Sequence, residues 1–175
     1  MKYPRAILPL FQKRLRPNKV VLLIGPRRVG KTVFIKNFVN GLSIDQCLIL
    51  NGDDVLDMAL LKERSVPNYK RLLEGKEYLI IDEAQHIPDI GMILKLIVDS
   101  IDGIKVIASG SSAFDLYHQV GEPLVGRKST LYLYPLAQME IGKLEDFRTT
   151  QANREERLIF GGYPELNQYP NWKDK

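Results

Sequence analysis

Five short apolar runs, rich in β-branched residues, recur along the 175-residue chain and alternate with segments of helical periodicity. A continuous apolar run of this length is typical of a strand that is buried on both faces of a sheet. The expected strands span residues 20–25, 47–54, 77–85, 104–112 and 129–136. Strands that alternate with helices predict an α/β fold of three layers, in which helices cover both faces of a parallel sheet.

The segments between these runs carry apolar residues at helical spacing. After Thr32, "VFIKNFVN" reads as a buried helix, and Gly41 is expected to end it. Further helices are expected at residues 5–15, 55–63, 68–75, 90–101, 113–120 and within 154–166. Polar residues gather where the apolar strands end, and open α/β sheets bind their ligands at that edge.

The stretch "GPRRVGKT", residues 25–32, fits the phosphate-loop pattern G-x-x-x-x-G-K-[ST], and it follows an expected strand and opens an expected helix. Glycines at positions 25 and 30 let the backbone approach phosphates closely, with its N–H groups pointing inward at a helix N-terminus. Lys31 would contact the β- and γ-phosphates, and the Thr32 hydroxyl would contact Mg²⁺. The residues expected to contact the nucleotide are Gly25, Pro26, Arg27, Arg28, Val29, Gly30, Lys31, Thr32 and Val33.

The third apolar run ends on two carboxylates. "LIID" brings Asp82 to the same sheet edge, where it would hold Mg²⁺ through its water shell. Glu83 follows directly and would orient or deprotonate an attacking water. The alternative is a strand that simply ends in an acidic turn, and the phosphate loop 50 residues earlier disfavours it.

Other strand ends carry further candidates. Ser109, in "ASGSS", would sense the γ-phosphate or place the attacking water, whereas Ser111 or Ser112 would cap the next helix. Asp54 is expected to cap a helix, and Asp53 is a weaker candidate for facing the active centre.

Arg127 lies in "LVGRKST", before the fifth strand. An arginine there would stabilise transition-state charge in a neighbouring subunit, which would make the protein a homo-oligomer. The alternative is a surface arginine beside Lys128. Arg27 and Arg28 have no assigned chemistry, because their side chains are equally suited to point outward to a partner.

Charge is distributed unevenly along a chain whose net charge is +4. Residues 1–44 hold ten Lys and Arg and no Asp or Glu, while residues 45–175 carry a net charge of −6. This basic stretch is either a nucleic-acid face or a solvated helix end combined with the phosphate loop.

The composition excludes several other classes of protein. The single cysteine, Cys47, rules out a disulfide framework and reads as a buried thiol, and two separated histidines give no zinc site. No apolar run approaches the ~20 residues of a membrane span, and the N-terminus lacks the features of a secretory signal. We therefore expect no membrane partner and a cytoplasmic protein.

The pieces "GPRRVGKT", "LIIDEAQ", "ASGSS", "VGRKSTLYLYPL" and "GGYPE" together resemble the AAA-type P-loop ATPases of archaea and bacteria, over about residues 18–165. The resemblance implies an ASCE-division core with strand order 5-1-4-3-2 that binds ATP and Mg²⁺. It marks Lys31 and Thr32 of the Walker A loop as phosphate and metal contacts. Asp82 becomes the Walker B metal carboxylate and Glu83 the catalytic one.

The same resemblance places Ser109 at the sensor position and Arg127 where such ATPases often carry an arginine finger. It also suggests three divisions: a leading helix or arm (1–17), the ATPase core (18–136) and a helical segment (137–175). Relatives usually continue into a second domain, so the last segment is expected to be the start of a truncated one; the alternative is a natural stand-alone ATPase domain. Adenine is inferred mainly from the resemblance, because no guanine-reading "NKxD" motif is present.

Three functions compete at this point. The first is a Mg²⁺-dependent ATPase that is slow as a monomer, favoured by Glu83 beside Asp82. The second is a nucleotide-gated switch that binds ATP or ADP with little turnover until a partner completes the site. The third is a DNA-associated motor or accessory factor, suggested by the basic first 44 residues.

Overall fold

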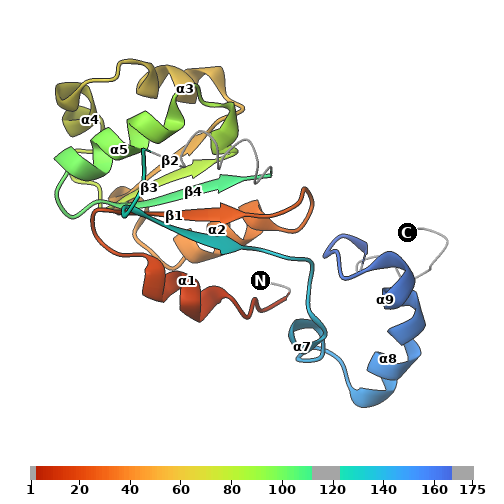
Figure 1. Ribbon diagram of the computed structural model, residues 1–175. Coiled ribbons are helices and arrows are strands. Elements are labelled where there is room, and N and C mark those ends of the chain that lie inside the picture. Colours follow the sequence, from red (N-terminus) through yellow and green to blue (C-terminus); the bar gives the residue numbers. More distant parts are fainter. Residues whose placement is uncertain (1–2, 112–122, 167–175) are drawn as a thin grey trace.

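The computed structural model describes residues 3–111 and 123–166, which contain one five-stranded sheet with helices on both of its faces (Figure 1). The strands are β1 (Lys19–Ile24), β2 (Cys47–Asn51), β3 (Tyr78–Asp82), β4 (Lys105–Gly110) and β5 (Lys128–Tyr132). All neighbouring pairs are parallel, in the order β2-β3-β4-β1-β5. This is the predicted order 5-1-4-3-2 read from the other edge, so the three-layer P-loop NTPase fold is confirmed.

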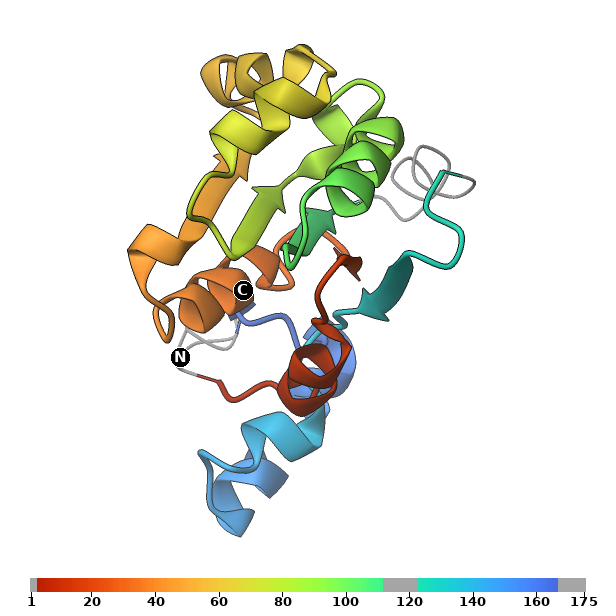
Figure 2. The same cartoon turned by 90° about the vertical axis from the view of Figure 1, so that its left-hand side faces the viewer.

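Two helical layers bury the two faces of the sheet (Figures 1 and 2). Helices α1 (Leu8–Arg14) and α2 (Lys31–Val39) cover one face. Helices α3 (Val55–Lys62), α4 (Val66–Leu72) and α5 (Ile90–Ser100) cover the other. Short 3₁₀ turns at η1 (Ile44–Gln46) and η2 (Ala84–His86) complete the connections.

Alternation along β1 shows how its apolar run serves both layers. Val21 and Leu23 pack into the cluster that contains Phe11 and Phe34, on the side of α1 and α2. Val20, Leu22 and Ile24 pack into the cluster on the side of α3, α4 and α5. Successive side chains of a strand point to opposite faces, so a central strand covered on both sides has to be apolar throughout.

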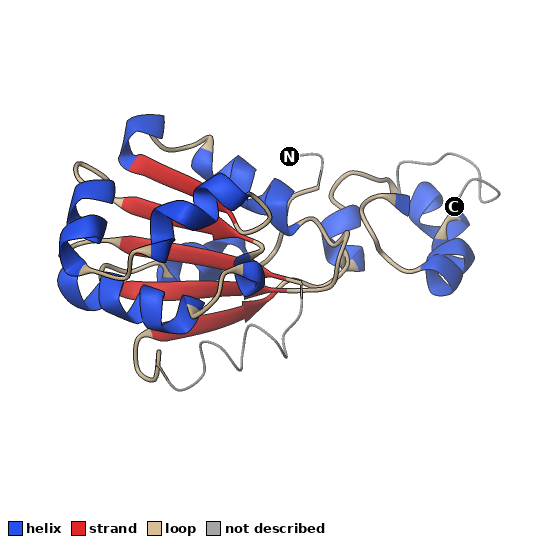
Figure 3. Ribbon diagram, turned by 90° about the horizontal axis from the view of Figure 1, so that it is seen from above, coloured by secondary structure: helices blue, strands red, loops and turns tan. Residues whose placement is uncertain are grey.

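A small helical group follows β5 and lies beyond the carboxyl ends of the strands (Figure 3). It consists of α7 (Gln138–Ile141), α8 (Phe147–Ala152) and α9 (Arg154–Phe160). Only the last of these was expected from the sequence. The sequence does carry a start signal for α8, namely an aspartate at position 146 directly before the helix. In the structure Asp146 is the N-cap and accepts a hydrogen bond from the Thr149 N–H at 2.7 Å.

Several elements end earlier than predicted. β5 stops at Tyr132 rather than at residue 136, because Tyr132 pairs with Ile24, where β1 itself ends. β3 stops at Asp82, because Glu83 adopts a left-handed backbone conformation with φ 49°. The helix expected at residues 113–120 lies outside the described residues.

Within the described part of the chain, the helices are too short and too polar for any of them to cross a bilayer.

Candidate active site

The phosphate loop connects β1 to α2, and two of its glycines are required by geometry. A Cβ on Gly25 would lie 2.2 Å from the Leu133 carbonyl oxygen, so no other residue fits there without backbone movement. Gly30 has φ +93°, a conformation that L side chains rarely adopt. The loop therefore passes close to the chain that follows β5 and then turns sharply into α2.

Lys31 is buried at the first position of α2. Its Nζ donates hydrogen bonds to the carbonyl oxygens of Gly25 (2.9 Å) and Pro26 (3.0 Å). Burial lowers the pKa of Lys31, while the Glu83 and Asp82 carboxylates oppose that shift. The Lys31 ammonium is thus held inside its own loop by two uncharged carbonyl oxygens. It can leave these acceptors to bind an anion that enters the loop.

Asp82 joins three elements at the carboxyl edge of the sheet. Thr32 Oγ1 donates to Asp82 Oδ2 at 2.6 Å, although the two residues are 50 positions apart. Ser109, fully buried at the end of β4, donates its hydroxyl to Asp82 Oδ1. The structure therefore brings the predicted metal pair together and places Ser109 against the same carboxylate.

Glu83 follows Asp82 in a turn that its surroundings impose. A Cβ on Gly52 would lie 2.2 Å from the Glu83 carbonyl oxygen, and the Gly52 N–H donates to the Asp82 carbonyl at 2.8 Å. The Glu83 carboxylate accepts a hydrogen bond from Gln85 Nε2 at 2.6 Å. Both the backbone and the carboxylate of Glu83 are thus held by specific partners.

One of the two separated histidines, His86, was assigned no role from the sequence and lies in the same place. His86 Nδ1 is 2.5 Å from Asp53 Oδ1, and both side chains line the cleft in front of the phosphate loop. The weaker prediction that Asp53 faces this site therefore agrees with the geometry. Asp54 caps α3 as expected, because its Oδ1 accepts from the Leu56 N–H at 2.8 Å.

The cleft itself has a volume of about 450 Å³ and gathers residues from four parts of the chain. Two of them, Pro164 and Glu165, were not predicted as site residues, although "GGYPE" was part of the resemblance. The residues that line the cleft are Arg27, Arg28, Gly30, Lys31, Thr32, Val33, Asp53, Glu83, His86, Pro164 and Glu165.

The donors present fit a magnesium ion. Groups of three or more His, Cys, Asp and Glu side chains suited to a metal do not occur among residues 3–111 and 123–166. Mg²⁺ needs no such cage, because it is usually bound by one or two protein oxygens together with substrate phosphates and water. One hydroxyl and one carboxylate already in contact, Thr32 and Asp82, match that requirement.

Arg127 is not brought to this site within the chain. Its carbonyl accepts from the Val20 N–H at 2.9 Å, at the start of β1, and its Nε pairs with Asp99 Oδ1 at 2.6 Å. The phosphate loop begins after Ile24, about four strand residues or roughly 13 Å further along. A role for Arg127 in a neighbouring subunit stays a prediction.

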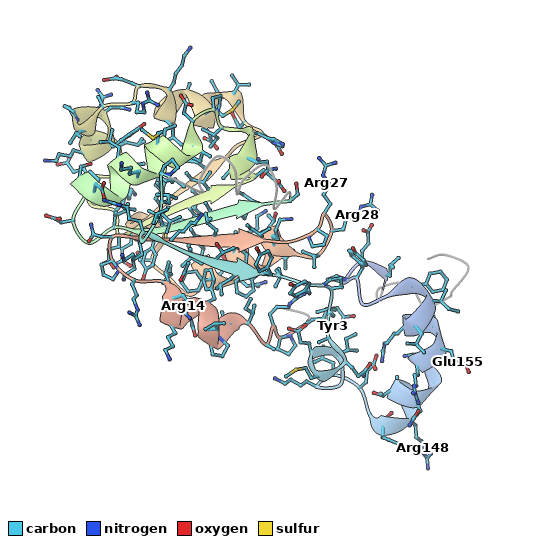
Figure 4. The ribbon with its side chains drawn as sticks, viewed as in Figure 1. Tyr3, Arg14, Arg27, Arg28, Arg148 and Glu155 are labelled. Atoms are coloured by element: carbon cyan, nitrogen blue, oxygen red, sulfur yellow. The ribbon has the colours of Figure 1, made fainter. Side chains whose placement is uncertain are left out.

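The basic residues of the first 44 positions also separate in space. Arg5 and Lys31 are buried, and Lys19 Nζ donates to the Gly126 carbonyl at 2.6 Å. Arg14 projects from α1, away from Arg28 at the phosphate loop (Figure 4). The charge asymmetry of the sequence thus combines residues with different roles.

Comparison with known proteins identifies the family of this chain. A family model described as an AAA domain matches residues 17–142. An uncharacterized protein of Methanocaldococcus jannaschii is 25% identical over 166 residues, covering 87% of this chain and 37% of the relative. Uncharacterized proteins of Mycobacterium bovis and Mycobacterium tuberculosis are each 32% identical over 134 residues, covering 75% of this chain and 29% of those relatives. The chain thus spans about a third of the length of these relatives, and it belongs to the AAA domain family.

Proposed function

We propose that this AAA domain binds ATP with Mg²⁺ and hydrolyses it. The observation that carries the proposal is the contact of Thr32 with Asp82 directly beside the buried Lys31. A hydroxyl from the phosphate loop and a carboxylate from the end of β3 meet there. In P-loop NTPases residues at these two positions hold magnesium, so Thr32 and Asp82 would hold it here, where it would supply positive charge beside the phosphates.

Each residue then has a defined task. The loop N–H groups bind the phosphate oxygens at the start of α2, and Lys31 exchanges its two carbonyl acceptors for phosphate. Thr32 and Asp82 would hold Mg²⁺, which neutralises developing negative charge. Ser109 keeps Asp82 oriented through its hydroxyl. Glu83 orients and deprotonates the attacking water.

Turnover of ATP in the presence of Mg²⁺ tests the proposal. Lys31→Ala is expected to abolish nucleotide binding, whereas Lys36→Ala, an exposed lysine of the same helix, should bind as the wild type does. Glu83→Gln is expected to keep ATP bound while turnover falls by a factor of 10² or more. Normal hydrolysis by Glu83→Gln would show that the base is another group.

A nucleotide-gated switch is the second candidate, and the contact between Gln85 and Glu83 favours it. The hydrogen bond from Gln85 Nε2 at 2.6 Å holds the Glu83 carboxylate in one orientation, and a partner that breaks this bond would free the carboxylate to turn toward the attacking water. Measuring turnover per molecule over a protein concentration series separates the two functions. Turnover that rises with concentration indicates an ATPase completed between subunits, which is also the test of Arg127 acting in a neighbouring site. Tight ATP binding without turnover at every concentration indicates a switch.

A further inference from the structure

Residues 161–165, termed the return segment, follow α9 and come back to the phosphate loop. The Leu136 N–H donates to the Gly162 carbonyl at 2.7 Å and fixes the start of the segment. Pro164 then packs against the loop, since its Cγ lies 3.8 Å from a Cβ built on Gly30. Glu165 Oε2 lies 3.4 Å from Arg28 Nη1. Both Pro164 and Glu165 line the nucleotide cleft.

Backbone geometry, rather than the ion pair, holds the return segment in place. Gly161 has φ +75°, and a Cβ on Gly162 would lie 2.2 Å from the Leu136 carbonyl oxygen. The chain leading to Leu136 is itself attached to β1, because the Leu133 N–H donates to the Ile24 carbonyl at 2.7 Å. The two glycines of "GGYPE" are thus required to bring Glu165 to the loop.

The charge of Glu165 conflicts with the proposed ligand. Its side chain is 44% exposed and that of Arg28 is 77% exposed, and ion pairs in such positions are weak and easily exchanged. A nucleoside triphosphate brings several negative charges to the same loop. Its phosphates attract Arg28 and repel the Glu165 carboxylate, so both effects act against the pair.

We propose that Glu165 is a positioning residue that competes with the nucleotide phosphates for Arg28, an inference that rests on the proposed function. Glu165 occupies Arg28 when the site holds no nucleotide and is displaced from it by the phosphates. The coupling is reciprocal: nucleotide weakens the pairing of Glu165 with Arg28, and loss of that pairing strengthens nucleotide binding by the same factor.

Calorimetric titration with ADP and with a non-hydrolysable ATP analogue, in Mg²⁺ buffer, tests this coupling. Glu165→Gln keeps the shape of the side chain and removes its charge, so it is expected to bind the analogue about threefold to fivefold more tightly. Glu155→Gln makes the same charge change on α9, where the side chain is exposed and lies away from the loop (Figure 4). That control should bind as the wild type does. Weaker binding by Glu165→Gln, or binding equal to the control, overturns the inference.

A double-mutant cycle with Arg28→Gln separates this role from a general charge effect. In the Arg28→Gln background, Glu165→Gln is expected to gain less affinity than in the wild type, because only the direct repulsion between Glu165 and the phosphates is left to remove. An equal gain in both backgrounds overturns the inference. Lys31→Ala distinguishes failure of the proposed nucleotide binding from failure of the role of Glu165. If the wild type binds no better than Lys31→Ala, the proposed function fails. If the wild type binds and Lys31→Ala does not, while Glu165→Gln equals Glu155→Gln, only the role of Glu165 fails.

Discussion

Replacing Arg5 tests how the arm before α1 supports the phosphate loop. Arg5 is only 9% exposed. Its Nη1 donates to the Val29 carbonyl at 3.3 Å, Nη2 donates to the Tyr134 carbonyl, and Nε lies 3.4 Å from Glu140 Oε1. Glu140 is 5% exposed and also accepts from the Ala6 N–H at 2.6 Å. Burial lowers the pKa of Arg5, and the Glu140 carboxylate opposes that shift.

The expected cost follows from leaving one charge of this pair buried without the other. Removing one partner of a buried ion pair destabilises a protein by about 3–5 kcal/mol. For a domain of this size, each kcal/mol shifts the melting temperature by about 2–4 °C. Arg5→Met should therefore lower Tm by roughly 6–20 °C. Arg14→Met, an exposed arginine of α1, should change it by less than about 2 °C.

Urea unfolding of the single and double variants measures whether Arg5 and Glu140 act as a pair. Glu140→Leu alone should cost about as much as Arg5→Met, because it leaves the guanidinium buried and uncompensated. The double variant Arg5→Met/Glu140→Leu should be more stable than either single variant, since no unpaired charge is left in it. A cost below about 1 kcal/mol for Arg5→Met, or a double variant whose loss equals the sum of the two, would refute the reasoning.

Three further perturbations have defined outcomes. Gly52→Ala forces a Cβ into the Glu83 carbonyl and should cost about 2–3 kcal/mol in urea unfolding while also lowering kcat. Because burial lowers the pKa of Lys31, its native form binds fewer protons than the unfolded chain below its ordinary value of 10.5. The contribution of Lys31 to the free energy of unfolding thus rises with pH in that alkaline range. Lys31→Met should remove this rise in the free energy of unfolding, measured between about pH 8 and pH 10. Asp54→Ala removes the cap of α3 and should cost about 1 kcal/mol of stability by thermal unfolding, with nucleotide affinity unchanged.

The sequence predicted the parts of this protein that depend on local patterns. Continuous apolar runs identified all five strands, and the spacing of "GPRRVGKT" placed the loop between β1 and α2. Thr32 and Asp82 were expected at the same edge of the sheet, because the loop before Thr32 follows β1 and Asp82 ends β3, and the carboxyl ends of parallel strands share one edge. Their direct contact agrees with that placement. Arg127 lies away from the loop for the same reason. It precedes β5, so it lies at the amino edge of the parallel sheet, whereas the loop follows the carboxyl end of β1.

The contacts that were missed join residues far apart in the chain without a periodic signal. Arg5 and Glu140 are 135 positions apart, and neither belongs to a recognisable motif. The contact of His86 with Asp53 depends on the turn at Glu83, whose left-handed conformation is set by the close approach of Gly52. Such contacts follow from how finished elements pack, which a pattern along the chain does not encode.

These long-range contacts couple the conformation of the phosphate loop to the segments of the chain that precede and follow the core. The Val29 carbonyl accepts a hydrogen bond from Arg5, Gly25 lies close against the carbonyl of Leu133, and Gly30 lies near Pro164. Because the packing around Gly25 leaves no room for a Cβ, the loop and the chain after β5 cannot move independently there. Any nucleotide that rearranges the loop must therefore act on these neighbouring segments as well. Glu165 is the neighbour most exposed to that action, because it is the carboxylate of the return segment that lines the cleft.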